Sequence, residues 1–305
     1  MSVKTRQVER VVGPVMVLEG AGVRLRRTIA SRNLDYLDPF LLLDHFGSDN
    51  PADYMAGFPM HPHRGIETVT YMLEGFVRHK DSLGNAGTIG AGDVQWMTAG
   101  SGIMHEEMPR PDGTRMYGFQ LWVNLPARHK MARPRYQEYA AGDIPQVEVD
   151  GGAHVRVIAG EAGGVRGPVS EITIAPSYLD VHVPADATFT HPVQPGHTAF
   201  AYGYEGQGIF QPEGEAIPTP SLVVFGDGDH VHVRAADAPL RFLLVSGQPL
   251  HEPVARYGPF VMNTRGEIQQ ALQDLRDGTF VKVQPQTESD QWYGSALLER
   301  RGGPA

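Results

Sequence analysis

The amino-acid sequence predicts an all-β protein, and two observations carry this prediction. Of its 305 residues, 36 are glycine and 24 are proline, which leaves little room for long helices and favours short strands joined by turns. The apolar stretches lack a helical period, and turn residues recur about every ten positions. This spacing is typical of sandwiches and barrels, the group that includes jelly rolls.

The expected strands of the N-terminal half lie between these turn signals. The first two flank a turn at Gly20-Ala21-Gly22, and the next is a buried-looking apolar run. Each strand is rich in β-branched, aromatic or other apolar residues. Together they cover residues 15–29, 40–46, 67–75, 93–97 and 116–123.

Strand-like runs resume after a connector, at about 135 to 175, that is rich in glycine and proline. The pattern Tyr71-x-x-Glu74-Gly75 reappears as Tyr202-x-x-Glu205-Gly206. This internal match predicts a duplicated barrel, with one domain at residues 1–134 and a second at residues 135–305. The later runs cover residues 179–183, 198–204, 221–225, 230–234 and 240–245.

One helix is expected near the C-terminus, within the second domain. Thr264 and Glu267 have the spacing of a capping box, and Gly278 can end the helix. Apolar residues recur between them at i, i+3, i+4 and i+7, so that we expect one face to pack against a barrel. This stripe consists of Ile268, Ala271, Leu272 and Leu275.

Composition excludes several classes of function. The formal net charge of −9 argues against a nonspecific nucleic-acid groove, which needs a surplus of lysine and arginine. No apolar run approaches the roughly 20 residues that span a bilayer, and the N-terminus lacks the apolar centre of a signal peptide. Cysteine is absent, so disulfides and thiolate metal ligands are excluded. We therefore expect a cytoplasmic protein that contacts neither membrane nor nucleic acid directly.

Two short motifs predict a metal site. His61 and His63 are two residues apart, so that in a strand both imidazoles point to the same face. His105 and Glu107 repeat this spacing some forty residues later, after a stretch whose glycines let the chain turn back. Three neutral imidazoles and one carboxylate suit Fe(II), and also Mn, Ni, Cu or Zn.

Histidine spacing alone is a weak signal, because the chain has 13 histidines and His230 and His232 show the same spacing. An H-x-H pair followed by an H-x-E pair is more specific, and the C-terminal half lacks this combination. We therefore expect one metal site in the N-terminal half and a second barrel without metal. The carboxylate ligand stays open at this point, because Glu67 has the same strand parity as His61 and His63.

Several longer stretches of the sequence resemble the pirin family, a branch of the cupin superfamily. They are the LLLDHF run and residues 61–75, 92–109, 118–126 and 247–264. The resemblance implies a bicupin, with two antiparallel barrels of the jelly-roll type, whose N-terminal barrel holds iron through three histidines and one glutamate. Carried over position by position, these ligands are His61, His63, His105 and Glu107.

General cupins take their carboxylate ligand from the position of Glu67, whereas the pirin-like pattern takes it from the second motif, at Glu107. The resemblance therefore favours Glu107. Glu67 then has a supporting or structural role, and Glu106 is expected to face away from the metal. Metal-bound histidines usually have polar neighbours, so nearby polar residues are candidate pocket groups. These candidates are Asp44, His45 and Gln120.

Two functions are consistent with such a site. Pirin-like proteins are similar to quercetin 2,3-dioxygenases, which implies an Fe(II)-dependent enzyme that opens the ring of a flavonol-like substrate with O2. Glu107 is then a metal ligand and also the base that takes the substrate's hydroxyl proton. Some pirins are similar to transcriptional co-regulators, which implies instead a redox-sensitive iron protein that binds a partner protein. We favour the enzyme.

Overall fold

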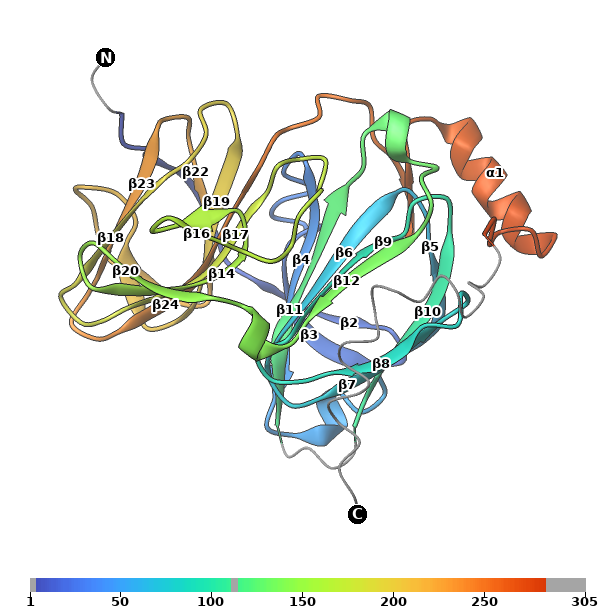
Figure 1. The fold of residues 1–305 in the computed structure, drawn as a ribbon, viewed down its shortest axis with the longest axis horizontal. Coiled ribbons are helices and arrows are strands. Elements are labelled where there is room, and N and C mark those ends of the chain that lie inside the picture. The colour runs from blue at the N-terminus through green and yellow to red at the C-terminus, as the bar shows by residue number, and fades with distance from the viewer. Residues whose placement is uncertain (1–3, 111–114, 284–305) are drawn as a thin grey trace. The chain divides into compact units, whose positions relative to one another are not determined.

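The computed structural model describes residues 4–110 and 115–283 (Figure 1). The prediction of an all-β fold is confirmed, since α1(Arg265–Arg276) is the single α-helix among these residues. The chain divides into two compact units, and each contains one seven-stranded and one four-stranded antiparallel sheet. Within the described ranges, no helix is long and apolar enough to cross a membrane.

Each unit draws on more than one part of the chain. The N-terminal unit comprises residues 16–27, 40–141 and 251 onward, and the C-terminal unit comprises residues 1–15, 28–39 and 142–250. The sequence suggested one boundary near residue 134, with the helix in the second domain. Instead, β1(Val8–Val12) pairs with β22(Ser221–Phe225) in the C-terminal unit, and α1 packs on β26(Phe260–Met262) in the N-terminal unit.

The N-terminal unit has two antiparallel sheets. The larger sheet has the strand order β12(Arg135–Tyr139), β9(Val94–Thr98), β6(Ile66–Glu74), β11(Met116–Asn124), β4(Phe40–Ser48), β3(Val23–Ile29), β2(Val15–Glu19). The smaller sheet has the order β5(Phe58–His63), β10(Ile103–Pro109), β7(Val77–Asp81), β8(Ala86–Ile89).

The C-terminal unit repeats this plan of seven and four strands. Its larger sheet has the order β1, β22, β19(Thr198–Glu205), β24(Leu240–Gly247), β17(Ser177–Val183), β14(Ala153–Ala159), β13(Gln146–Val149). Its smaller sheet has the order β18(Thr188–Pro192), β23(His230–Ala235), β20(Gln207–Ile209), β21(Ile217–Pro218). The remaining short elements are η1(Pro51–Asp53), η2(Ala127–His129), η3(Ala141–Asp143), β15(Glu161–Ala162), β16(Val165–Arg166) and β25(Ala255–Tyr257).

The interior of the C-terminal unit is filled by apolar side chains from both sheets. Phe189 of the smaller sheet lies edge-to-face against Phe242 of the larger one, with ring centroids 5.7 Å apart. Both rings are fully buried, as are Val233 and Leu244 in the same cluster. Burial of each such side chain contributes about 1.5–3 kcal/mol, so this unit is stabilised by one continuous core.

The interior of the N-terminal unit is interrupted by polar side chains. On β4, Leu41 belongs to one apolar cluster and Phe46 to another, and Asp44 lies between them. On β6, Ile66 and Met72 belong to the same two clusters. The two apolar clusters therefore bracket a polar zone that crosses the larger sheet.

Helix α1 begins at the predicted capping box. The Thr264 hydroxyl accepts a hydrogen bond from the Glu267 amide, and the Glu267 carboxylate accepts one from the Thr264 amide. Ile268 and Ala271 of the predicted stripe are buried, but Leu275 is 38% exposed. The apolar face is thus shorter by one turn than the sequence pattern suggests.

Candidate metal centre

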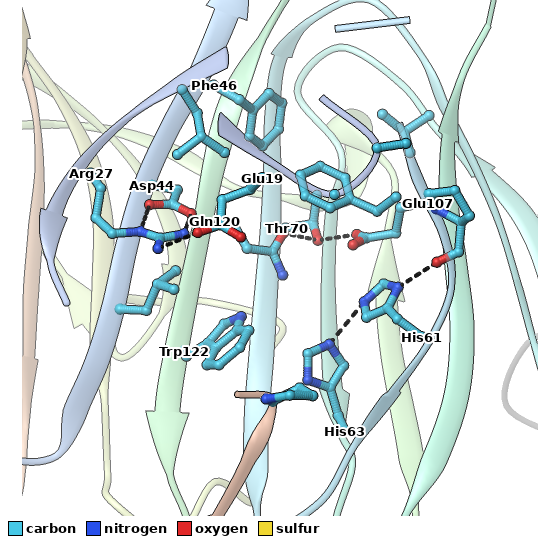
Figure 2. Close-up of a pocket in the computed structure, with 18 of the residues that line it drawn as sticks. Glu19, Arg27, Asp44, Phe46, His61, His63, Thr70, Glu107, Gln120 and Trp122 are labelled. Carbon is cyan, nitrogen blue, oxygen red and sulfur yellow. Dashed lines mark hydrogen bonds and ion pairs between the residues drawn. The ribbon is translucent and has the colours of Figure 1, made fainter. Parts of the chain in front are cut away.

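Three histidines meet where β5 and β10 pair. These strands are antiparallel, and His105 lies directly opposite His61 in the register. Side chains alternate along each strand, so His61, His63 and His105 point to the same side. Their candidate ligand nitrogens all lie within 4.8 Å of one another. Figure 2 shows the His61 and His63 rings turned towards each other at the wall of a pocket.

The geometry of these histidines fits a bound metal ion. The Nε2 atoms of His61 and His63 are 3.1 Å apart, close to the separation of about 3 Å for two nitrogens that bind one ion at right angles and at usual bond lengths. The carbonyl oxygen of Pro59 lies 2.9 Å from His61 Nδ1, which orients the ring so that Nε2 faces the other two histidines.

Burial keeps two of the imidazoles neutral. His63 is 2% exposed and His105 is 1% exposed, and burial is the main cause that lowers the pKa of each well below its usual value. Among the described residues, neither ring nitrogen of His105 has a hydrogen-bond partner. A buried nitrogen without a partner costs free energy, and a cation held by the neutral rings removes that cost.

Glu107 lines the same pocket, with only 8% of its surface exposed. Its Oε1 accepts a hydrogen bond of 3.0 Å from the Thr70 hydroxyl, and Oε2 makes no hydrogen bond within the described part of the chain. The neighbouring Glu106 points the other way, as expected, and forms an ion pair of 3.0 Å with Lys80.

Glu67, the alternative carboxylate, lies outside the pocket. Its two oxygens accept hydrogen bonds from the Trp96 indole at 3.1 Å and from the Thr98 hydroxyl at 2.7 Å. Burial raises the pKa of this carboxyl group. Glu67 therefore joins neighbouring strands of the larger sheet, and its carboxylate is turned away from the histidines.

The pocket encloses about 480 Å³, and its walls are mainly apolar. Among the predicted polar neighbours, Asp44 and Gln120 line it and His45 does not. His45 was expected beside the site, but it has the opposite strand parity to Asp44 and packs on Phe119, with ring centroids 4.8 Å apart. Other lining residues include Glu19, Leu25, Arg27, Leu42, Phe46, Thr70, Val77, Met116, Trp122 and Arg256.

Two of these lining residues could have been found by extending the strand alternation. Trp122 is two residues beyond Gln120, and its ring lies edge-on to His63 with centroids 5.0 Å apart. Arg27 is two residues beyond the buried Leu25 and forms ion pairs with two carboxylates of the pocket. Arg256, whose guanidinium lies 5.1 Å from the Trp122 ring, comes from a distant part of the chain and had no local signal.

The chain turns sharply directly after His63. Gly65 has φ of +79°, and a Cβ there would lie 2.0 Å from the carbonyl oxygen of Val261. The buried Lys130 ammonium bonds to the carbonyl oxygens of Gly65 and Val261, at 2.9 and 2.8 Å. Only glycine fits this turn, which ends β5 and starts β6.

Arg64 fixes the same turn to the C-terminal segment. Its buried guanidinium donates to the Asp274 carboxylate at 2.7 Å and to the carbonyl oxygens of Ser101 and Phe280 at 2.7 and 2.9 Å. All of these groups belong to the N-terminal unit. The helix therefore holds the residue next to a candidate metal ligand, although it contributes no ligand itself.

The two-sheet units, one of them with a histidine cluster at a pocket, define a bicupin. Residues 22–123 match the family model for pirin, and residues 178–281 match the model for the pirin C-terminal cupin domain. A pirin-like protein of Caulobacter vibrioides is 47% identical, over 90% of this chain and 99% of the relative. The chain belongs to the pirin family.

Solved structures support the same assignment. A quercetin 2,3-dioxygenase from Acinetobacter baumannii is 36% identical, covers 91% of this chain and 99% of its own, and superposes with a TM-score of 0.83. A bacterial pirin of Escherichia coli, solved in complex with nickel(II), shares the fold with a TM-score of 0.63 at 20% identity. It covers 79% of this chain and 99% of its own.

Proposed function

We propose that this protein is a metal-dependent dioxygenase of the quercetinase type, which opens the ring of a flavonol with O2. The proposed ligands of a single ion, expected to be Fe(II), are His61, His63, His105 and Glu107. The observation that carries the proposal is a cluster of three histidines at the wall of a mainly apolar pocket. The similarity to a quercetin 2,3-dioxygenase supports the reaction class.

The donor set also suits Mn, Ni, Cu or Zn, because imidazole and carboxylate bind all of these metals. When bound, the ion supplies Lewis acidity towards the 3-hydroxyl and 4-carbonyl oxygens of a flavonol, and redox chemistry with O2. The protein contributes the orientation of the substrate, a base and the exclusion of water.

Glu107 is the proposed base for the flavonol 3-hydroxyl. Thr70 holds one carboxylate oxygen at 3.0 Å, which leaves the other available for a metal or a proton. Thr70 Oγ1 also lies 2.8 Å from the side-chain amide of Gln120. A hydroxyl has one proton, so both contacts are satisfied when the amide turns its nitrogen towards Thr70, and Thr70 then donates to Glu107.

The apolar walls suit a flat aromatic ligand. Leu42, Phe46 and Trp122 line the pocket, and the larger part of its lining is apolar. Aromatic surface that enters this pocket leaves water, which favours binding by roughly 25 cal/mol per Å² buried.

The test is metal content and O2 consumption with quercetin, measured on the same iron-reconstituted sample. We expect about one metal ion per chain, because the described residues contain one such histidine cluster, and O2 uptake with quercetin. The His63→Ala variant should lose both the metal and the O2 uptake. Glu107→Gln should lose O2 uptake, whereas Glu106→Gln, one residue away and facing outward, should retain it.

Each negative result contradicts a different part of this proposal. Full metal content without O2 uptake contradicts the action on quercetin and leaves the redox-sensitive co-regulator or an enzyme that acts on another substrate. Absence of any metal contradicts the site itself.

A further inference from the structure

A row of polar side chains crosses the floor of the pocket on four neighbouring strands. Gln120 of β11 lies opposite Asp44 of β4 on one side and opposite Thr70 of β6 on the other. Arg27 of β3 extends the row beyond Asp44. Adjacent strands are about 4.8 Å apart, so the row spans roughly 14 Å. Figure 2 shows it running from Arg27 to Thr70 and on to Glu107.

The end of this row farthest from Glu107 is a preformed ion cluster. Arg27 donates from Nε and Nη2 to the two oxygens of Asp44, both at 2.7 Å, and from Nη1 to Glu19 at 2.6 Å. Asp44 is 4% exposed and the Arg27 side chain is 13% exposed. Such a bidentate pair has a fixed geometry, so the cluster needs little reorganisation when a ligand arrives.

The cluster can accept hydrogen bonds but has few left to donate. All three guanidinium nitrogens of Arg27 already face carboxylates. Each oxygen of Asp44 accepts one hydrogen bond from Arg27 and has capacity for another, and Glu19 uses only Oε1. The free acceptor positions on Asp44 and Glu19 therefore favour a ligand group that donates a hydrogen bond, such as a hydroxyl.

We propose that Asp44 and Glu19, held in place by Arg27, bind a phenolic hydroxyl at the end of the ligand that is remote from the histidines. By this assignment the pocket selects flat aromatic compounds with hydroxyls at both ends. The inference rests on the proposed function for the identity of the ligand's other end, where the 3-hydroxyl and 4-carbonyl face Glu107. Asp44 and Glu19 are specificity-determining residues in this account and take no part in the chemistry.

A purely structural role for the cluster is the competing explanation, since the Arg27–Asp44 pair joins β3 to β4. The two roles differ in what they do to ligand selectivity. A structural pair affects all ligands alike, whereas a hydroxyl-binding pair affects only ligands that carry the remote hydroxyl. Glu19 separates the roles well, because its side chain is 42% exposed and its loss leaves the Arg27–Asp44 pair in place.

The experiment is anaerobic titration calorimetry with quercetin and with 3-hydroxyflavone, on metal-free and iron-loaded protein. 3-Hydroxyflavone keeps the 3-hydroxyl and the 4-carbonyl but lacks all other hydroxyls. We expect quercetin to bind at least about tenfold more tightly, the effect of one hydrogen bond to a charged group. Glu19→Gln and Asp44→Asn should reduce this ratio and leave 3-hydroxyflavone binding unchanged, and exposed Asp49→Asn should change neither.

Equal affinities in the wild-type protein, or an unchanged ratio in both variants, would overturn the proposal. Oxygen consumption on the same samples tests the proposed function separately. Preserved selectivity without O2 uptake contradicts the dioxygenase but not the hydroxyl site. Uptake without selectivity contradicts the hydroxyl site but not the dioxygenase.

Discussion

The two units have the same strand plan but opposite interiors. In the N-terminal unit the paired strands β5 and β10 carry the three histidines and Glu107. In the C-terminal unit the corresponding pair is β18 and β23, and β23 points Val231, Val233 and Ala235 into the core. The difference indicates that a few inward side chains on two strands distinguish a unit with a histidine-bearing pocket from a unit with a packed core.

The larger sheets show the same contrast. In the N-terminal unit, Asp44, Gln120 and Thr70 are register partners across three strands. On the corresponding strands of the C-terminal unit, Leu179 and Ala201 are both register partners of Leu244. The polar row is thus replaced by an apolar one.

Both units contain an H-x-H pair, but the two pairs lie on opposite faces of their strands. His230 and His232 have the H-x-H spacing, but they alternate with the buried Val231 and Val233. Their side chains therefore leave the opposite face of β23. His61 and His63 have the parity that points inward, towards His105.

The largest effect is expected when an inward histidine of β10 is replaced by valine, the residue type that points inward on β23. We expect His105→Val to abolish metal binding, because it removes one of three converging imidazoles. The melting temperature of the metal-free protein should rise, because a buried ring without partners is replaced by an apolar side chain. Elemental analysis and thermal unfolding measure both effects, and full metal content in the variant would contradict the site.

The next largest effect concerns helix α1, whose Asp274 binds the buried Arg64 within the N-terminal unit. Asp274→Asn removes the charge that faces the buried Arg64 at 2.7 Å. An unpaired buried charge costs about 3–5 kcal/mol, so we expect a large loss of stability in denaturant unfolding. Metal affinity should fall as well, because Arg64 adjoins His63. The exposed Asp277→Asn serves as the control. Equal stability of the two variants would mean that the Arg64–Asp274 ion pair does not stabilise the unit.

Cavity-forming substitutions compare the two interiors directly. Leu244→Ala in the packed core should cost about 2–5 kcal/mol, because the deleted atoms leave a new void. Leu42→Ala should cost less, because the space it vacates joins a pocket that already exists. Unfolding free energies of both variants check this order. Equal costs would mean that the two interiors are packed alike, and the reverse order would contradict the contrast between them.

The smallest effect is a pH dependence from the C-terminal core. Burial lowers the pKa of His191 to about 4, against an ordinary value of 6.5. Between these values the unfolded chain binds a proton that the folded protein does not, so the free energy of unfolding falls as the pH falls. The slope is at most about 1.4 kcal/mol per pH unit.

Unfolding at pH 6.5 and pH 4.5 measures this contribution. His191→Leu should show a shallower loss of stability on acidification than the wild-type protein. An exposed His154→Leu variant is the matched control. An unchanged slope in the His191 variant would mean that this residue does not contribute.

Local periodicity was enough to predict most strands of the two larger sheets, the histidine cluster and the helix cap, but it missed strands of the smaller sheets such as β7, β8, β18 and β20. These features depend on residues two to four positions apart, where backbone geometry fixes the direction of side chains. The Arg64–Asp274 pair joins residues 210 positions apart, and no local sequence pattern predicts it. The entry of β1 into the C-terminal unit was missed for the same reason.

The ambiguity between Glu67 and Glu107 has a definite physical origin. Counting alternate residues from His63 to Glu67 passes through Gly65, where β5 ends and β6 begins in the other sheet. Strand parity is not preserved through such a turn. His105 and Glu107 lie within one strand, so parity holds for them.

Anomalous diffraction at the iron edge, on crystals of iron-reconstituted protein, would test the proposed metal site directly. We expect one peak per chain, bound by His61, His63, His105 and Glu107, and none in the C-terminal unit. A peak bound by Glu67, a peak among the C-terminal histidines, or no peak at all would contradict it.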